Sequence, residues 1–221
     1  FGHENFHVYI PDRQIDGYGL AQKGIDILLE KKCTLIITID LGITGFVGAT
    51  YLKEKKVDLI ITDHHLPHKE LPDAYAIINP KKEGDIYPFK DLCGSGVVFK
   101  LVQGFLKNHR NEFGIQEGQE KWMLDMVGLA TLSDMVPLLG ENRVFAYYGM
   151  FVMKKTKRPG LLELFKQAGV KKENIAEDDI THSITPKLNA ASRMGNAYIS
   201  YNLLKTKDTQ EANIFAKELN S

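Results

Sequence analysis

Short apolar segments rich in β-branched residues recur along the first third of the chain, each about the length of a buried strand. They occupy residues 7–10, 34–39, 59–62 and 74–78. Helical patterns separate the first three: residues 20–31 place leucine and isoleucine on one side and lysine elsewhere, and residues 45–55 repeat this arrangement more weakly. The alternation predicts an α/β fold, with a parallel sheet flanked by helices and right-handed crossovers.

The pattern becomes mainly helical after Pro80, beyond a polar loop. Helices are predicted at residues 96–108, 119–132, 142–153 and 161–168, and most of residues 187–220 is predicted to be helical. Residues 178–181 precede a predicted loop that ends at Pro186. We therefore divide the chain into an α/β domain at residues 1–150 and a helical C-terminal extension at residues 151–221.

Composition excludes some classes of protein and leaves others open. The 28 basic and 28 acidic residues cancel, so a nucleic-acid-binding function must rest on local residues rather than on net charge. No apolar run approaches the roughly 20 residues that span a bilayer, which argues against a membrane role. Cys33 and Cys93 form no C-x-x-C pair, which fits the reducing cytoplasm. The chain opens at Phe1 without a secretion signal, and we expect it to be a fragment.

Polar residues follow two of the predicted strands at the point where each strand ends. Asp40 follows the apolar run at 35–39, and Asp63, His64 and His65 follow the run at 59–62. Ligands bind at the carboxyl edge of open α/β sheets, and carboxylates with imidazoles suit divalent metals. The alternative is that Asp40 caps a helix and that His64 or His65 packs under a loop. Recurrence at successive strand ends favours a site.

Several ordered motifs resemble those of the DHH phosphoesterase family. Thr-Asp-His-His at residues 62–65 resembles its signature, and residues 39–43 resemble its preceding aspartate motif. Residues 91–100 look like its glycine-containing motif. Residues 129–138 look like the segment with its last metal aspartate, here Asp134, which alone is only a polar residue at the end of a predicted helix.

The RecJ-type exonuclease branch of this family is the most similar. Residues 9–13, 17–20 and 186–195 resemble motifs of that branch. The family's first motif is expected upstream of Phe1, and its later substrate-binding and oligonucleotide-binding domains have no counterpart before Ser221. The resemblance therefore implies a catalytic-domain fragment that lacks part of the metal site and is inactive alone.

The resemblance implies metal-dependent hydrolysis of phosphodiesters, with 5'-to-3' degradation of single-stranded DNA in repair and recombination. Two Mn²⁺ or Mg²⁺ ions about 3.5–4 Å apart would activate the nucleophile and neutralise charge. Asp40 would bridge both ions, and His64 and Asp134 would complete one site. Asp63 would orient a ligand, and His65 would contact the scissile phosphate or protonate the leaving oxygen.

Further residues are implied to contact DNA. Arg13, Asn189 and Arg193 would hold phosphates, because guanidinium and amide groups donate hydrogen bonds to phosphate oxygens. Gly94 and Gly96 open a predicted helix whose N–H groups either bind an anion or form a structural turn. Single-stranded DNA is the expected partner, with a single-strand-binding protein and a helicase implied by the family, in the cytoplasm and away from membranes.

Two rival functions share the same residues. A small DHH phosphodiesterase acting on oligoribonucleotides or cyclic dinucleotides would also use Asp40, His64, His65 and Asp134, but Arg13 and the motif at 189–193 favour the RecJ branch. A DHH-derived scaffold without metals would bind DNA without cleaving it, yet the metal-ligand positions present here are intact. A metal soak distinguishes a true site from a fortuitous motif match.

Overall fold

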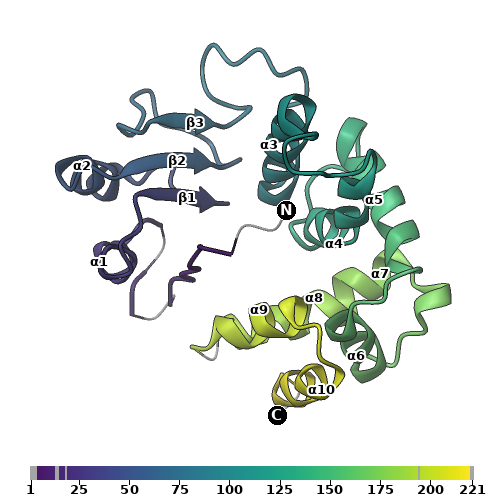
Figure 1. The fold of residues 1–221 in the computed structure, drawn as a ribbon. Coiled ribbons are helices and arrows are strands. Elements are labelled where there is room, and N and C mark those ends of the chain that lie inside the picture. Colours follow the sequence, from purple (N-terminus) through teal and green to yellow (C-terminus); the bar gives the residue numbers. More distant parts are fainter. Residues whose placement is uncertain (1–3, 13–14, 18, 194, 220–221) are drawn as a thin grey trace.

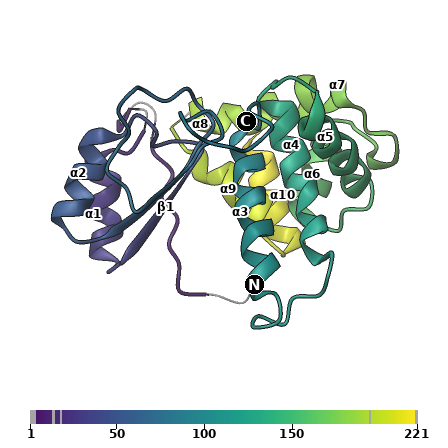
Figure 2. The ribbon, with the colours of Figure 1, turned by 90° about the horizontal axis from the view of Figure 1, so that it is seen from above.

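A three-stranded parallel sheet and a larger group of helices make up the computed structural model, which describes residues 4–12, 15–17, 19–193 and 195–219 (Figure 1). The strands are β1 (Leu35–Ile39), β2 (Asp58–Thr62) and β3 (Ala76–Ile78), in the order β1-β2-β3. Helices α1 (Gln22–Glu30) and α2 (Phe46–Glu54) cover one face, and α3 (Gly94–His109) lies on the other (Figure 2). The predicted α/β fold is confirmed.

Alternation along the strands explains why α1 and α2 pack where they do. In β1, Ile36 and Thr38 are buried, and in β2 Leu59 and Ile61 are buried on the same side. Successive strand residues point to opposite faces, so these side chains form one apolar surface. That surface packs against a cluster that includes Ile25 of α1 and the α2 residues Ala49 and Leu52.

β1 lies at an edge of this sheet and has a partly uncovered outer face. Leu35, Ile37 and Ile39 are 45%, 48% and 54% exposed. Within the described ranges β1 pairs with β2 alone.

The predicted strand at residues 7–10 is wrong, because this segment has no strand structure. Two of its backbone groups form hydrogen bonds with Tyr198 of α9 (Ala197–Lys205) instead. Ile10 N–H donates to Tyr198 Oη at 3.1 Å, and Tyr198 O–H donates to Val8 O at 3.4 Å. The apolar composition of residues 7–10 matched that of a strand, but composition does not determine which groups form hydrogen bonds with the backbone.

The helical part has its own core. Its main elements are α4 (Leu124–Ser133), α5 (Gly140–Met153), α6 (Pro159–Gln167), α8 (Thr185–Arg193), α9 and α10 (Thr209–Glu218). Shorter turns are η1 (Gln119–Met123), η2 (Lys172–Asn174), α7 (Glu177–Asp179) and η3 (Ile180–Ile184). One apolar cluster extends from Leu129 to Leu219 and so draws on both sides of residue 150. The domain division at that residue stays a prediction.

Two predicted boundaries in this part differ from the structure. The predicted helix at 119–132 begins as the 3₁₀ turn η1 before α4 starts at Leu124. The predicted loop ending at Pro186 is helical, because the π turn η3 runs directly into α8. Pro186 therefore lies inside a continuous helical run, where proline removes one backbone hydrogen bond, and the π turn directly before it is where the run departs from regular α-helical bonding.

No helix in the described part of the chain combines the length and apolarity required to cross a bilayer.

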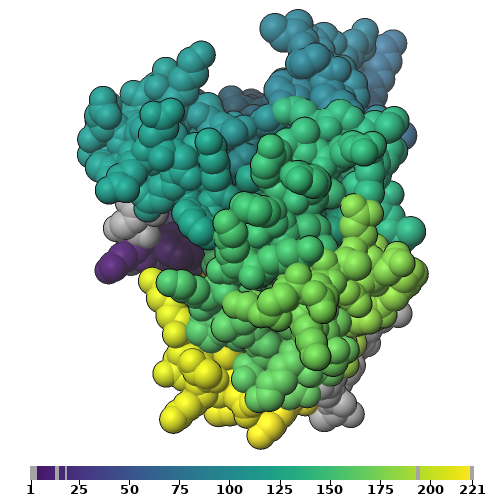
Figure 3. All heavy atoms as spheres, turned by 90° about the vertical axis from the view of Figure 1, so that its right-hand side faces the viewer, coloured from purple at the N-terminus to yellow at the C-terminus, as the bar shows by residue number. Residues whose placement is uncertain are grey.

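The N-terminal segment, purple in Figure 3, lies between the α3 region in teal and the C-terminal helices in yellow. Segments from opposite ends of the sequence therefore meet on this side of the molecule.

Candidate metal centre

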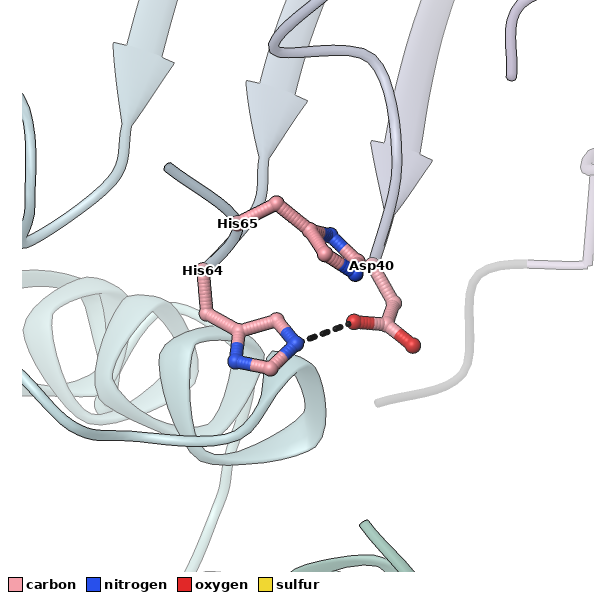
Figure 4. A group of neighbouring side chains, drawn as sticks. All are labelled: Asp40, His64 and His65. Carbon is pink, nitrogen blue, oxygen red and sulfur yellow. Dashed lines mark ion pairs between the residues drawn. The ribbon is translucent and has the colours of Figure 1, made fainter. Parts of the chain in front are cut away.

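Three of the predicted residues meet at the carboxyl edge of the sheet. Asp40 directly follows β1, and His64 and His65 follow β2. The two strands are parallel neighbours, so their ends meet at one edge, where Asp40 N–H donates to Thr62 O at 2.9 Å. Both imidazole rings turn toward the Asp40 carboxylate (Figure 4).

The distances fit a shared ion. His64 Nε2 lies 3.1 Å from Asp40 Oδ1 and 3.5 Å from Asp134 Oδ2. Asp134 reaches this point because it follows the last residue of α4. One ligand atom each from Asp40, His64 and His65 lies within 4.8 Å of the others, so His65 is near enough to these two residues to be a further candidate ligand.

Asp63 is buried and forms hydrogen bonds with both histidines. Its Oδ1 accepts the backbone N–H of His64 at 2.7 Å and of His65 at 3.1 Å, and it lies 2.7 Å from His65 Nδ1. Its Oδ2 accepts Ile43 N–H at 3.0 Å. Burial raises the pKa of Asp63, but these hydrogen bonds outweigh burial and lower it overall. The lowered pKa favours the ionised form of Asp63, which can hold the His65 ring by a hydrogen bond. That Asp63 orients a metal ligand stays a prediction.

The backbone of Asp40 is in a left-handed conformation, with φ of 63°. This conformation is uncommon outside glycine, although aspartate is among the residues that adopt it. Gly94, at the start of α3, lies against the side chain: a Cβ there would be 2.3 Å from Asp40 Oδ1. The absence of a side chain at Gly94 therefore makes room for the Asp40 carboxylate.

The donor set favours a cation. The hydrogen bond to Asp40 raises the pKa of His64, although burial opposes this shift. Burial raises the pKa of Asp134, and the neighbouring Asp40 raises it further, while His64 lowers it. Two carboxylates and an imidazole facing one point are the donors that Mn²⁺ and Mg²⁺ sites use. The residues present fit the predicted metal.

Sequence reasoning missed a contributor at the end of the third strand. Asn79 is fully buried directly after β3, its amide donates to His65 O at 2.9 Å, and its Oδ1 accepts Lys81 N–H at 2.8 Å. The positive charge of Lys81 slightly lowers the pKa of His64 and of Asp134, so its side chain acts on the site electrostatically. The signal was available, because Asn79 follows its strand as Asp40 and Asp63 follow theirs.

The remaining predicted residues are less closely tied to this centre. Gly96 is buried against Leu92 and Phe145, and Asn189 is exposed on α8. Arg13 and the side chain of Arg193 lie outside the described residues. Contacts of Gly94, Gly96, Asn189 and the two arginines with phosphate stay predictions.

Comparison with known proteins places this geometry in a family. The model of the DHH family, N-terminal domain, matches residues 1–131. The chain is 39% identical to single-stranded-DNA-specific exonuclease RecJ of Bacillus subtilis over 96% of its own length and 26% of the relative's. It is 34% identical to RecJ of Escherichia coli over 100% of its own length and 39% of the relative's.

Solved structures give the same result. The structure of exonuclease RecJ bound to manganese matches with a TM-score of 0.84 and 30% identity, over 97% of this chain and 52% of that one. RecJ from Thermus thermophilus in complex with Mn²⁺ matches with a TM-score of 0.76 and 28% identity, over 90% of this chain and 28% of that one. The chain thus spans 26% and 39% of the length of the curated relatives from Bacillus subtilis and Escherichia coli. The chain belongs to the DHH family, and within that family it is similar to RecJ exonucleases.

Proposed function

We propose that this chain carries the metal-binding core of a single-strand-specific DNA exonuclease that hydrolyses phosphodiester bonds with Mn²⁺ or Mg²⁺. The observation that carries the proposal is the convergence of Asp40, His64 and Asp134 on one point, with His64 Nε2 at 3.1 and 3.5 Å from the two carboxylates. The curated relatives are named as single-stranded-DNA-specific exonucleases, and similar solved structures of RecJ hold Mn²⁺ or Mg²⁺.

The side chains divide the work of hydrolysis. Asp40, His64 and Asp134 would hold the metal, which supplies an activated water and neutralises charge on the attacking and leaving oxygens. Asp63 Oδ1 lies 2.7 Å from Nδ1 of His65, and we assign this contact to a hydrogen bond that Asp63 accepts from Nδ1–H. With Nε2 also protonated, His65 would contact the scissile phosphate or give its Nε2 proton to the leaving oxygen. The Asp63 carboxylate would stabilise the imidazolium before that transfer and hold Nδ1–H after it.

We assign binding of the DNA strand to the residues predicted to contact phosphate. Arg13, Asn189 and Arg193 bind phosphates of the strand, and Gly94 and Gly96 present N–H groups at the start of α3. We further assign the parent protein a 5'-to-3' polarity and a cytoplasmic role in DNA repair and recombination. A single-strand-binding protein and a helicase are its proposed partners. The similarity to RecJ over nearly the whole chain supports these assignments.

The rival DHH phosphodiesterase for short oligoribonucleotides or cyclic dinucleotides is not favoured. The curated relatives matched over nearly all of the chain are RecJ proteins from several bacteria. A metal-free scaffold is disfavoured by the site itself, which retains two carboxylates facing an imidazole.

The test is Mn²⁺-dependent digestion of single-stranded and double-stranded DNA by this chain and by its extension to the full length of the relatives. This chain alone is expected not to digest DNA. In the extended protein, Asp40→Ala should abolish digestion of single strands, because the variant removes the carboxylate nearest to His64. Asp58→Ala is the matched control, because Asp58 is exposed at the opposite end of β2. Equal digestion by wild type and Asp40→Ala would contradict the proposal, as would a preference for cyclic dinucleotides over DNA.

A further inference from the structure

Asn142 is a fully buried amide that has no part in the chemistry proposed above. It lies in the first turn of α5, and its amide nitrogen donates to Asp91 O at 2.6 Å and to Pro137 O at 3.0 Å. These two carbonyl oxygens fix the orientation of the amide, because a flipped amide would place Oδ1 against both of them. Asn142 therefore joins two segments that are distant in the sequence.

The segment around Pro137 follows shortly after a predicted metal ligand. Asp134 is the first residue beyond α4. Between Asp134 and the start of α5 at Gly140 the chain forms no helix or strand. Pro137 O also accepts Leu139 N–H at 2.8 Å, so two hydrogen bonds hold this connection at one carbonyl group. The bond from Asn142 therefore limits where the turn after Asp134 can lie.

The segment at Asp91 leads to the other side of the metal centre. α3 begins shortly afterwards at Gly94, where a Cβ would lie 2.3 Å from Asp40 Oδ1. Cys93, directly before α3, is buried, and its Sγ lies 3.4 Å from Thr131 Oγ1 of α4. This turn is therefore packed between the Asp40 carboxylate and α4.

Asn142 is itself held in place relative to α3. The preceding residue, Glu141, forms an ion pair with Lys100 of α3. One turn further along α5, the Phe145 ring packs edge to face on Phe99 of α3, with ring centroids 5.6 Å apart. Both aromatic side chains are buried. The amide therefore acts from a fixed base, and the part that its bonds restrain is the connection after α4.

We propose that Asn142 is a positioning residue for the metal centre, which fixes the turn after Asp134 relative to the turn that enters α3 beside Asp40. His64 Nε2 lies 3.1 Å from Asp40 Oδ1 and 3.5 Å from Asp134 Oδ2, so the two carboxylates reach one point only while their segments keep this separation. This inference rests on the proposed function, because that function assigns both carboxylates to the metal. Asn142 itself binds neither metal nor substrate.

The test is the Mn²⁺ affinity of Asn142→Asp, measured by electron paramagnetic resonance in the protein extended to the full length of the relatives. This isosteric change replaces the donor with an oxygen that repels both carbonyl oxygens, so the affinity should fall about tenfold. Asp125→Asn is the matched control, because it is also isosteric and buried. Asp125 accepts Arg158 Nε–H at 2.6 Å at the other end of α4. The control should lower the urea midpoint of unfolding and leave Mn²⁺ affinity unchanged.

Two further measurements separate positioning from a general loss of structure. Because Asn142 acts through Asp134, Asn142→Asp should cost no more than about twofold in Mn²⁺ affinity when Asp134→Ala is also present. Amide hydrogen exchange at residues 134–139 should be faster in Asn142→Ala than in wild type or Asp125→Asn. Asn142→Ala removes the donors without adding repulsion, so the exchange measurement decides the matter even where Asn142→Asp does not fold. Equal losses of affinity in both backgrounds, or wild-type exchange at residues 134–139, overturn the proposal.

The outcomes also distinguish this proposal from the proposed function. If Asp134→Ala binds Mn²⁺ as wild type does, the metal centre of the proposed function fails and the role of Asn142 fails with it. If Asp134→Ala weakens Mn²⁺ binding and Asn142→Asp binds the ion as wild type does, only the role of Asn142 is overturned.

Discussion

Gly94→Ala is expected to damage the metal centre without damaging the fold. The added Cβ would lie 2.3 Å from Asp40 Oδ1 and 2.6 Å from Asp40 Cβ and Cγ. Since nonbonded carbon atoms are best separated by about 3.5 Å, the Asp40 carboxylate must move by about 1 Å. Misplacement by that distance lowers catalytic rate about 100-fold. In the protein extended to the full length of the relatives, single-turnover hydrolysis of single-stranded DNA and Mn²⁺ affinity measured by electron paramagnetic resonance should both fall.

Gly104→Ala supplies the control within the same helix, because a Cβ there meets no atom within 4 Å. Alanine is favoured over glycine in a helix interior by about 0.5–1 kcal/mol. Gly104→Ala should therefore raise the free energy of unfolding in urea and leave hydrolysis and Mn²⁺ affinity unchanged. Wild-type Mn²⁺ affinity and hydrolysis in Gly94→Ala would refute the claim that this glycine makes room for Asp40.

Three further outcomes are expected. Asp63→Asn weakens the contact that orients His65, so hydrolysis and Mn²⁺ affinity should fall about 10- to 100-fold, and wild-type values would argue against that role. Because the pKa of Asp63 is held below its usual 3.8 in the folded chain, its charge stabilises the fold above pH 3.8. That contribution is lost as pH falls below 3.8, so urea titrations should show a steeper acid loss in wild type than in Asp63→Asn. Gly128→Ala places a Cβ 2.7 Å from Gly149 Cα where α4 crosses α5, and should lower the free energy of unfolding by about 1–3 kcal/mol; an unchanged urea midpoint would contradict it.

The ends of the strands were the most predictable part of the molecule. Asp40 and His64 lie just after apolar runs of strand length, and neighbouring parallel strands bring their carboxyl ends to one edge of the sheet. The proximity of Asp134 to His64 could not be predicted from the periodicity of apolar residues, because it depends on how α4 is placed in space. Asp134 was identified as a candidate from its position in a motif that resembles the family's.

The N-terminal segment shows where such reasoning fails. Residues 7–10 have the composition of a strand, but their backbone partners are in α9, which lies almost 190 positions later. Asp16 belongs to no periodic pattern, so nothing in its own segment predicted that its side chain, 1% exposed, pairs with Lys23. A polar side chain is buried where hydrogen-bonding partners from distant segments surround it, and the local sequence does not identify those partners.

The left-handed backbone at Asp40 sets catalysis against thermodynamic stability. A side chain in this conformation costs about 1 kcal/mol relative to glycine, less for aspartate than for most residues. Met135, beside Asp134, has the same conformation, with φ of 55°. A sequence optimised for folding alone would place glycine at both positions and lose a metal ligand at the first. Variants at Asp40 that melt at a higher temperature are therefore the ones to suspect of having lost their chemistry, because the strain is the condition under which the carboxylate faces His64.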